Sequence, residues 1–199
     1  MTSGDWPSTN GDWPSVEGIV LRPWAADDRD ALVAAWVDPE VRRWTAVPDD
    51  VSLDAAARWI AGDRCRRAEG VALDLVGVSV EDGQIIGEVG LSAFDAGRRA
   101  ARIGWWTAAP ERGRGVAKAM VRAMTDWAHN GSLALRVVVA EVDPANPASV
   151  AVARAAGYEL LGKVSGQFTD GSVNDGRLVF ASQAPAFETT GEGESAARV

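Results

Sequence analysis

The sequence predicts a single α/β (α+β) domain with a mixed central sheet of about seven strands flanked by about four helices. Three observations lead to this prediction. Alternating or β-branched segments separated by short turns occur at 71–80, 84–94 and 100–107, as in antiparallel strands joined by hairpins. An uninterrupted apolar segment at 135–142 is typical of a strand buried in the centre of a sheet. Segments with helical apolar spacing precede and follow these strands.

Composition and charge exclude several classes of protein. The chain has 199 residues, of which 47% are hydrophobic and 24% charged, and its net charge of −8 argues against a broad basic face for nucleic acid. No apolar run approaches the ~20 residues of a membrane span, and the first residues lack the basic and apolar regions of a signal peptide. The single cysteine, Cys65, allows no internal disulfide, and no group of residues has the spacing of metal ligands. We therefore expect a cytoplasmic protein with no metal, nucleic-acid or membrane partner.

Both ends of the chain are expected to lie outside the domain, which is predicted at 17–182. Residues 1–16 contain the pentapeptide Gly-Asp-Trp-Pro-Ser twice, in a segment rich in Gly, Pro, Ser and Asp. This composition predicts a disordered or loosely pinned arm, whose two Trp residues dock either on the body or on a partner. The polar and acidic residues 183–199 predict a disordered tail.

The first elements of the domain are a strand and the helices that follow it. Residues 17–24 are predicted to form the strand. A helix with acidic residues in its first turn comes next, and Pro39 interrupts it before a shorter helical piece. After a loop at 44–50, Ser52 is a good N-cap for a helix that ends near Glu69.

The rest of the domain begins with the three strands already described, which Glu-Asp-Gly and Asp-Ala-Gly turns connect. A glycine-rich loop then leads into a helix. The elements predicted from this point are a helix at 116–129, a strand at 135–142, a helix from Asn146 to a C-terminal Gly157, and a hairpin of strands at 158–164 and 173–182.

The glycine-rich loop before the helix at 116–129 carries the strongest functional pattern. Residues 112–115 read Arg-Gly-Arg-Gly and open directly into a helix that begins near Val116. A helix N-terminus has unpaired N–H groups and a positive dipole end, and glycines let a ligand approach the backbone closely. The two arginines and Lys118 add positive charge. The pattern indicates a pyrophosphate cradle, although it has neither the spacing of a P-loop nor the position of a dinucleotide fingerprint.

Four short motifs occur in a fixed order around this loop. They are Leu21-Arg22-Pro23, Ile103-Gly104-Trp105-Trp106, Asn146-Pro147-Ala148-Ser149 and Ala156-Gly157-Tyr158. The loop itself, 112–117, matches the pattern Arg/Gln-x-x-Gly-x-Gly/Ala. With these motifs and this order of elements, the chain over 17–182 resembles the GNAT superfamily of acyl-CoA-dependent N-acyltransferases, and most closely its RimJ/RimL-like branch.

The resemblance implies an N-acetyltransferase in which an amine directly attacks the thioester of acetyl-CoA, or of another acyl-CoA, in a ternary complex. The acceptor would be either a small-molecule amine or a protein N-terminus, and a homodimer is expected from the family alone. The alternative is a non-catalytic acyl-CoA-binding or regulatory protein. That alternative stays open because relatives often carry Glu where this chain has Arg102.

The resemblance also implies which residues contact the acyl-CoA. Main-chain groups near Trp106, Thr107 and Ala108 would contact pantetheine between two splayed strands. The residues that would hold the pyrophosphate are Arg112, Gly113, Arg114, Gly115, Val116, Ala117 and Lys118. Asn146 would hydrogen-bond pantetheine, or it simply caps its helix. Arg154 either reaches the CoA phosphates or is a solvated surface residue.

The proton donor is implied to be Ser149. Many members of the superfamily carry a tyrosine seven residues after the asparagine, but here that position is Ala153, and Tyr158 is expected to pack in the sheet. In the RimL-like branch the serine of Asn-x-x-Ser has this role. Ser149 lies three residues after Asn146 and therefore on the same helical face.

The general base is left open between two glutamates and a water chain. Glu88 and Glu141 are the side-chain candidates, and each either faces the cleft or points to solvent. Trp44, in the loop expected to form the acceptor side of the cleft, is the candidate for binding a cationic or ring-bearing acceptor.

Overall fold

The computed structural model describes residues 13–167 and 173–185. In these residues the chain forms the helices α1 (Arg29–Val37), α2 (Pro39–Trp44), α3 (Leu53–Ala68), α4 (Val116–Asn130) and α5 (Pro147–Ala155). Two 3-10 helices are η1 (Ala26–Asp28) and η2 (Ala109–Glu111). The strands are β1 (Ser15–Val16), β2 (Ile19–Pro23), β3 (Ala72–Ser79), β4 (Ile85–Asp95), β5 (Ala100–Thr107), β6 (Val137–Val142), β7 (Glu159–Gln167) and β8 (Val173–Gln183).

The strands form one mixed sheet in the order β1-β2-β3-β4-β5-β6-β8-β7. Neighbouring strands run antiparallel except β5 and β6, which are parallel. The predicted mixed sheet is therefore confirmed, with eight strands rather than about seven. The additional strand is β1, whose two residues are too short to give a periodic sequence pattern.

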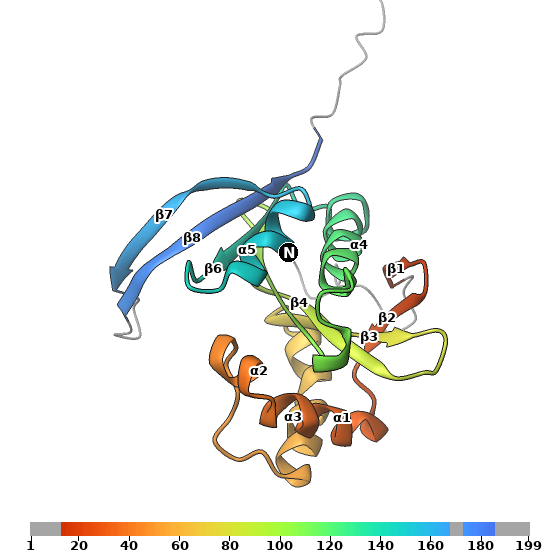
Figure 1. The fold of residues 1–199 in the computed structure, drawn as a ribbon. Helices are drawn as coiled ribbons and strands as arrows, with labels where there is room; N and C mark the ends of the chain where they lie inside the picture. Colours follow the sequence, from red (N-terminus) through yellow and green to blue (C-terminus); the bar gives the residue numbers. More distant parts are fainter. Residues whose placement is uncertain (1–12, 168–172, 186–199) are drawn as a thin grey trace, which may run out of the picture.

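The helices cover the two faces of the sheet in separate groups (Figure 1). Helices α1, α2 and α3 lie together on one face, whereas α4 and α5 lie on the other. A Trp-rich cluster that includes Trp24, Trp36 and Val76 packs under the first group. The larger core lies under the second group, where Met120 occupies space that glycines on β3 and β4 leave open. A Cβ at Gly77 would come within 2.5 Å of Met120 Sδ, so the helix approaches the sheet closely there.

Trp13 and Ser15, from the second Gly-Asp-Trp-Pro-Ser copy, contact the body of the protein. Trp13 packs on Trp127 of α4 at 6.0 Å between ring centroids, and Arg67 of α3 lies 5.7 Å from the Trp13 ring. Pairing of Ser15 with Val20 then starts the sheet two residues before the expected domain boundary. The first copy, and the tail from residue 186, lie outside the described residues. Among the described helices, none has the length and apolarity needed to cross a membrane.

Candidate active site

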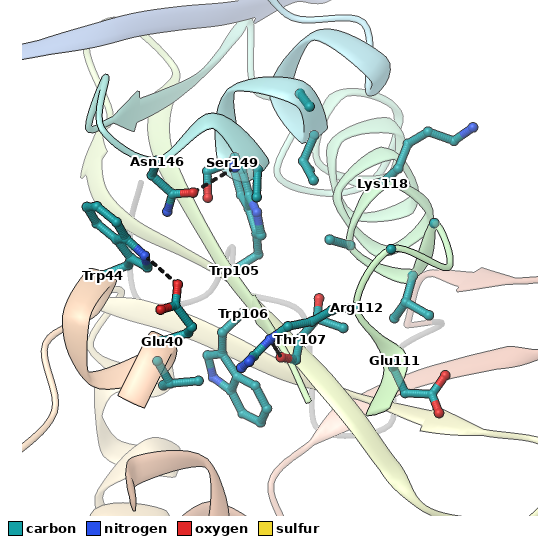
Figure 2. A pocket seen from close by; sticks show the side chains of 18 of the residues that line it. Glu40, Trp44, Trp105, Trp106, Thr107, Glu111, Arg112, Lys118, Asn146 and Ser149 are labelled. Carbon is teal, nitrogen blue, oxygen red and sulfur yellow. Dashed lines mark hydrogen bonds between the residues drawn. The ribbon is translucent and has the colours of Figure 1, made fainter. Parts of the chain in front are cut away.

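A cleft opens where the two parallel strands separate. Strands β5 and β6 pair only between Ala100–Arg102 and Val137–Val139, although β5 continues to Thr107. Beyond Arg102 the strands diverge, and a cavity of about 450 Å³ lies at this place. Figure 2 shows its walls, which come from α2, the end of β5, the glycine-rich loop, the start of α4 and one face of α5.

Most residues of the predicted site meet in this cavity. The predicted residues that line it are Trp44, Trp106, Thr107, Arg112, Gly113, Gly115, Val116, Ala117, Lys118, Asn146 and Ser149. Five others do not line it, namely Ala108, Arg114, Arg154, Glu88 and Glu141. The fold thus brings together α2, α4 and α5, which are far apart in the sequence.

The glycine-rich loop has the conformation that the sequence suggested. Gly113 and Gly115 have φ values of +75° and +86°, and a Cβ at either position would meet no atom within 4 Å. Backbone conformation rather than crowding therefore requires glycine here. Gly115 is the N-cap of α4, and no described side chain caps this helix. Its first N–H groups are thus available to an anion at the cavity wall.

The basic side chains around the loop differ in their hydrogen-bond partners and in the direction in which they extend. Arg112 Nη2 donates to Asp38 Oδ1 at 2.8 Å, and its Nε donates to the Thr107 carbonyl at 3.1 Å. Asp38 also caps α2, so Arg112 connects the loop to that helix. Arg114 donates to Glu111 at 2.9 and 3.0 Å. Lys118 is exposed and extends away from the cavity in Figure 2.

The main-chain groups of β5 differ in what they face. Ala108 N donates to Ile86 O of β4 at 2.9 Å. Because main-chain groups alternate sides along a strand, those of Trp106 also face β4, opposite Glu88. Thr107 then presents its main-chain groups to the side where β6 has diverged. Of the three groups expected to contact pantetheine, only the Thr107 main chain is free of β4.

Asn146 and Ser149 lie side by side at the start of α5. The Asn146 carboxamide oxygen accepts a hydrogen bond from Ser149 N at 3.0 Å, so Asn146 caps the helix. Both side chains line the cavity, and Figure 2 shows them at its upper wall. Ala153 is fully buried, and the Tyr158 hydroxyl is 2.6 Å from Thr125 Oγ1 inside the core. Tyr158 is therefore packed as expected, and burial raises its pKa.

Glu88 lies beneath the cavity on the sheet face that α3 covers. It is half-buried and accepts hydrogen bonds from Trp24 Nε1 at 2.7 Å and from Trp106 Nε1 at 3.2 Å. Burial, followed by the negative charge of Asp74, raises the pKa of Glu88 to about 8, against the stabilising effect of the two indole N–H donors. Trp106 thus lies between the cavity and this carboxyl group.

Glu141 has a different environment. Its carboxylate lies 3.8 Å from Arg102 Nη1, and the Glu141 side chain is 26% exposed. The arginine that replaces the acidic residue expected at this position is therefore the cation that accompanies Glu141.

Sequence reasoning missed Glu40 and Trp105, which also line the cavity. Trp44 Nε1 donates to Glu40 Oε2 at 3.0 Å, and Arg43 stacks on the Trp44 ring at 4.6 Å. Spacing of four residues on a helix would have placed Glu40 beside Trp44. Strand alternation would have drawn attention to Trp105, because its side chain points to the opposite face of the sheet from that of Trp106. No group of His, Cys, Asp and Glu suited to a metal ion occurs among the described residues.

A family model described as "Acetyltransferase (GNAT) domain" matches residues 19–159. An "Uncharacterized N-acetyltransferase p20" of Bacillus licheniformis is 26% identical over 146 residues, which are 73% of this chain and 82% of that protein.

Solved structures of other acetyltransferases have the same fold. Mycobacterium smegmatis RimJ, in complex with CoA-disulfide, superimposes with a TM-score of 0.73 at 23% identity, over 85% of this chain and 84% of that one. The ribosomal-protein-S5-alanine acetyltransferase of Vibrio fischeri gives a TM-score of 0.74 at 16% identity, over 87% of this chain and 97% of that one.

Proposed function

The chain belongs to the GNAT acetyltransferase family, and on that premise we propose that it transfers the acetyl group of acetyl-CoA to a primary amine held in the cleft. The observation that carries the proposal is the separation of β5 from β6 directly beside a left-handed glycine loop and the uncapped start of α4. An unpaired strand edge suits an amide-bearing chain, and free helix N–H groups suit a pyrophosphate.

The residues of the cavity fit acetyl-CoA in three places. Gly113, Gly115 and the first N–H groups of α4 would hold the pyrophosphate. The Thr107 main chain and the Asn146 side-chain amide would bind pantetheine, because both face the gap between the strands. Arg112 supports the loop through Asp38, and Arg114 and Arg154 contribute at most long-range charge. When bound, the acetyl thioester supplies the electrophile.

Ser149 and Glu88 have the chemical properties of the acid and the base. The Ser149 hydroxyl lines the cavity at the α5 wall and would give a proton to the departing thiolate. Glu88, which lies behind Trp106, would accept a proton from the acceptor amine through a water molecule, and its raised pKa makes it a base near neutral pH. Glu141 is the weaker candidate because Arg102 accompanies it. With Glu88 available, the absence of Glu at position 102 gives little support to a non-catalytic protein.

The acceptor is proposed to be a cationic amine, either a small molecule or a protein N-terminus. Trp44 and Glu40 from α2 form an aromatic and acidic wall of the cavity, which suits a positively charged group. The V. fischeri relative is named for an alanine of ribosomal protein S5, which keeps a protein N-terminus in the proposal. A cytoplasmic location and a homodimer remain predictions.

Release of thiol from acetyl-CoA against small amines and N-terminal peptides tests the function. We expect turnover with one acceptor class, reduced roughly 10²-fold or more in Ser149→Ala and Glu88→Gln. The control is Asp126→Asn, a change at an exposed carboxylate on the opposite face of the sheet. Binding of acetyl-CoA without turnover on any acceptor would instead support the non-catalytic alternative.

A further inference from the structure

Glu88, the proposed general base, has an acidic neighbour on the same face of the sheet. In the register of β3 and β4, Asp74 lies opposite Gly90 and Val76 lies opposite Glu88, so Asp74 and Glu88 are diagonal neighbours on one face. Gly90 leaves room for this arrangement, because a Cβ at that position would collide with Asp74 Oδ1. The Asp74 carboxylate therefore lies over the strand that carries Glu88.

Helix α3 adds a third acid and two arginines to this face. Asp63 and Arg67 are buried, with side chains only 2% and 9% exposed, and their closest N–O distance is 3.4 Å. Arg66 lies 3.9 Å from Asp63 and 3.8 Å from Asp74. Asp63 Oδ1, Arg66 Nη2 and Arg67 Nη1 are buried without a hydrogen-bond partner among the described residues. These are loose ion pairs, so they neutralise the acids incompletely.

Two further charged pairs of the described residues lie on this face. Arg22 of β2 forms a two-point pair with Asp28 at 2.6 and 2.9 Å. Arg102 of β5 accompanies Glu141 of β6 at 3.8 Å. Among the residues that the structure describes, the cations close to this cluster of three acids (Asp63, Asp74 and Glu88) are Arg66 and Arg67. If all three were ionised, the cluster would carry one uncompensated negative charge in a buried place.

We propose that Asp74 and Glu88 form a coupled carboxylate pair that is ionised on both members in its active form and binds its first proton at Glu88, so that Asp74 sets the pH at which Glu88 accepts a proton from the acceptor amine. The proton leaves the amine nitrogen, crosses through water past Trp106 and joins a Glu88 carboxylate oxygen, so that Glu88 becomes the neutral member of the pair. Asp74 is a positioning residue, since it acts through Glu88. Its kinetic consequence rests on the proposed function, whereas the pair itself is a property of the substrate-free protein.

The electrostatics agree with this geometry. Burial, followed by the charge of Asp63, raises the pKa of Asp74 to about 6. Burial, followed by the charge of Asp74, raises the pKa of Glu88 to about 8. Two such sites titrate as a unit, and between these values the pair keeps one proton. Burial also raises the pKa of Asp63.

Two substitutions should move the Glu88 titration in opposite directions. Asp74→Asn removes a negative neighbour and should lower the Glu88 pKa by about one unit. Arg66→Gln removes the cation nearest Asp74 and should raise it. Asp126→Asn, the same chemical change on the opposite sheet face, should leave it unchanged. The direct readout is a carbon-13 titration of the Glu88 carboxyl without substrates, assigned with Glu88→Gln, after circular dichroism has verified folding.

The pH profile of kcat/KM separates this inference from the proposed function. We expect its acid limb to shift with the carboxyl titration, downward in Asp74→Asn and upward in Arg66→Gln. A Glu88 titration that moves in neither variant would overturn the pair. A titration that moves while the rate profile stays fixed would uphold the pair and overturn Glu88 as the base.

Discussion

At position 88 a half-buried glutamate accepts hydrogen bonds from two indoles and lies beside another acid. The indole donors favour the carboxylate, yet burial and Asp74 outweigh them and the pKa rises to about 8. This balance distinguishes Glu88 from Glu141, which lies next to Arg102. The two glutamates cannot be ranked from sequence, because their neighbours come from β3, β5, α3 and, through Trp24, the segment after β2.

The raised pKa of Glu88 predicts how activity depends on pH. A general base must be unprotonated, so kcat/KM should fall about tenfold for each pH unit below the Glu88 pKa of about 8 and level off above it. The amine acceptor also titrates, and acceptors of different basicity separate the two effects. A limb that follows only the acceptor, with the same limb in Glu88→Gln, would contradict the assignment.

Gly115 predicts an effect that depends on backbone conformation alone. Its φ of +86° is unfavourable for residues with a Cβ, although space for one exists. Gly115→Ala should therefore cost about 1 kcal/mol of folding stability. Gly115→Asn should cost less, since Asn tolerates this conformation better. Urea unfolding of both variants measures the difference, and equal losses would indicate that something other than φ selects glycine.

At the scale of elements, α5 shows how one residue serves both a helix and a site. Asn146 caps the helix through Ser149 N and lines the cavity with the same side chain. The sequence left two alternatives for Asn146, a helix cap or a pantetheine contact; the structure confirms the cap, and the pantetheine contact stays a prediction. Variants that separate the cap from the cavity contact are needed to decide which role matters for activity.

Asn146→Ala and Asn146→Asp make that separation. Alanine removes the cap and should cost about 1 kcal/mol of stability, whereas aspartate caps as well as asparagine does. Both variants lose the amide N–H₂ donor, so both should weaken acetyl-CoA binding. Thermal unfolding and calorimetric binding measure the two effects. Full affinity in Asn146→Asp would reduce Asn146 to a helix cap.

The boundaries of elements were predictable where local sequence decides them and less so elsewhere. The span of β5 is the predicted 100–107, and α4 ends one residue beyond the expected 116–129. Strand β6 starts at Val137 rather than at 135. Leu135 is an apolar core residue that precedes the strand, so the apolar pattern placed the predicted start two residues too early. The link from Arg112 to Asp38 joins residues 74 positions apart and leaves no local sequence pattern.

At the scale of the molecule, the order of elements and the mixed sheet were predictable, and the contacts between distant elements were not. Separation of β5 from β6 was expected only through family resemblance. The contact of Trp13 with α4 and α3 was one of two open alternatives, since a Trp in a Gly/Pro-rich arm has no periodic pattern to indicate its neighbours.

That contact predicts a contribution of the arm to stability. Trp13→Ala should cost about 1–2 kcal/mol, because it removes packing on Trp127 and the cation–π contact with Arg67. Trp13→Phe, which keeps an aromatic ring, is the matched control and should lose less. Urea unfolding followed by circular dichroism gives both values. An alanine variant as stable as the wild type would mean that the contact is energetically neutral.

The central claim is that acetyl-CoA occupies the cleft with its pyrophosphate at the glycine loop, and a calorimetric titration with acetyl-CoA tests it most directly. We predict one molecule bound per chain, with affinity reduced at least about 100-fold in Gly115→Trp, where a large side chain fills the loop. The strain of that substitution is measured separately through Gly115→Ala. Absence of binding to the wild type, or equal affinity in Gly115→Trp, would contradict the claim.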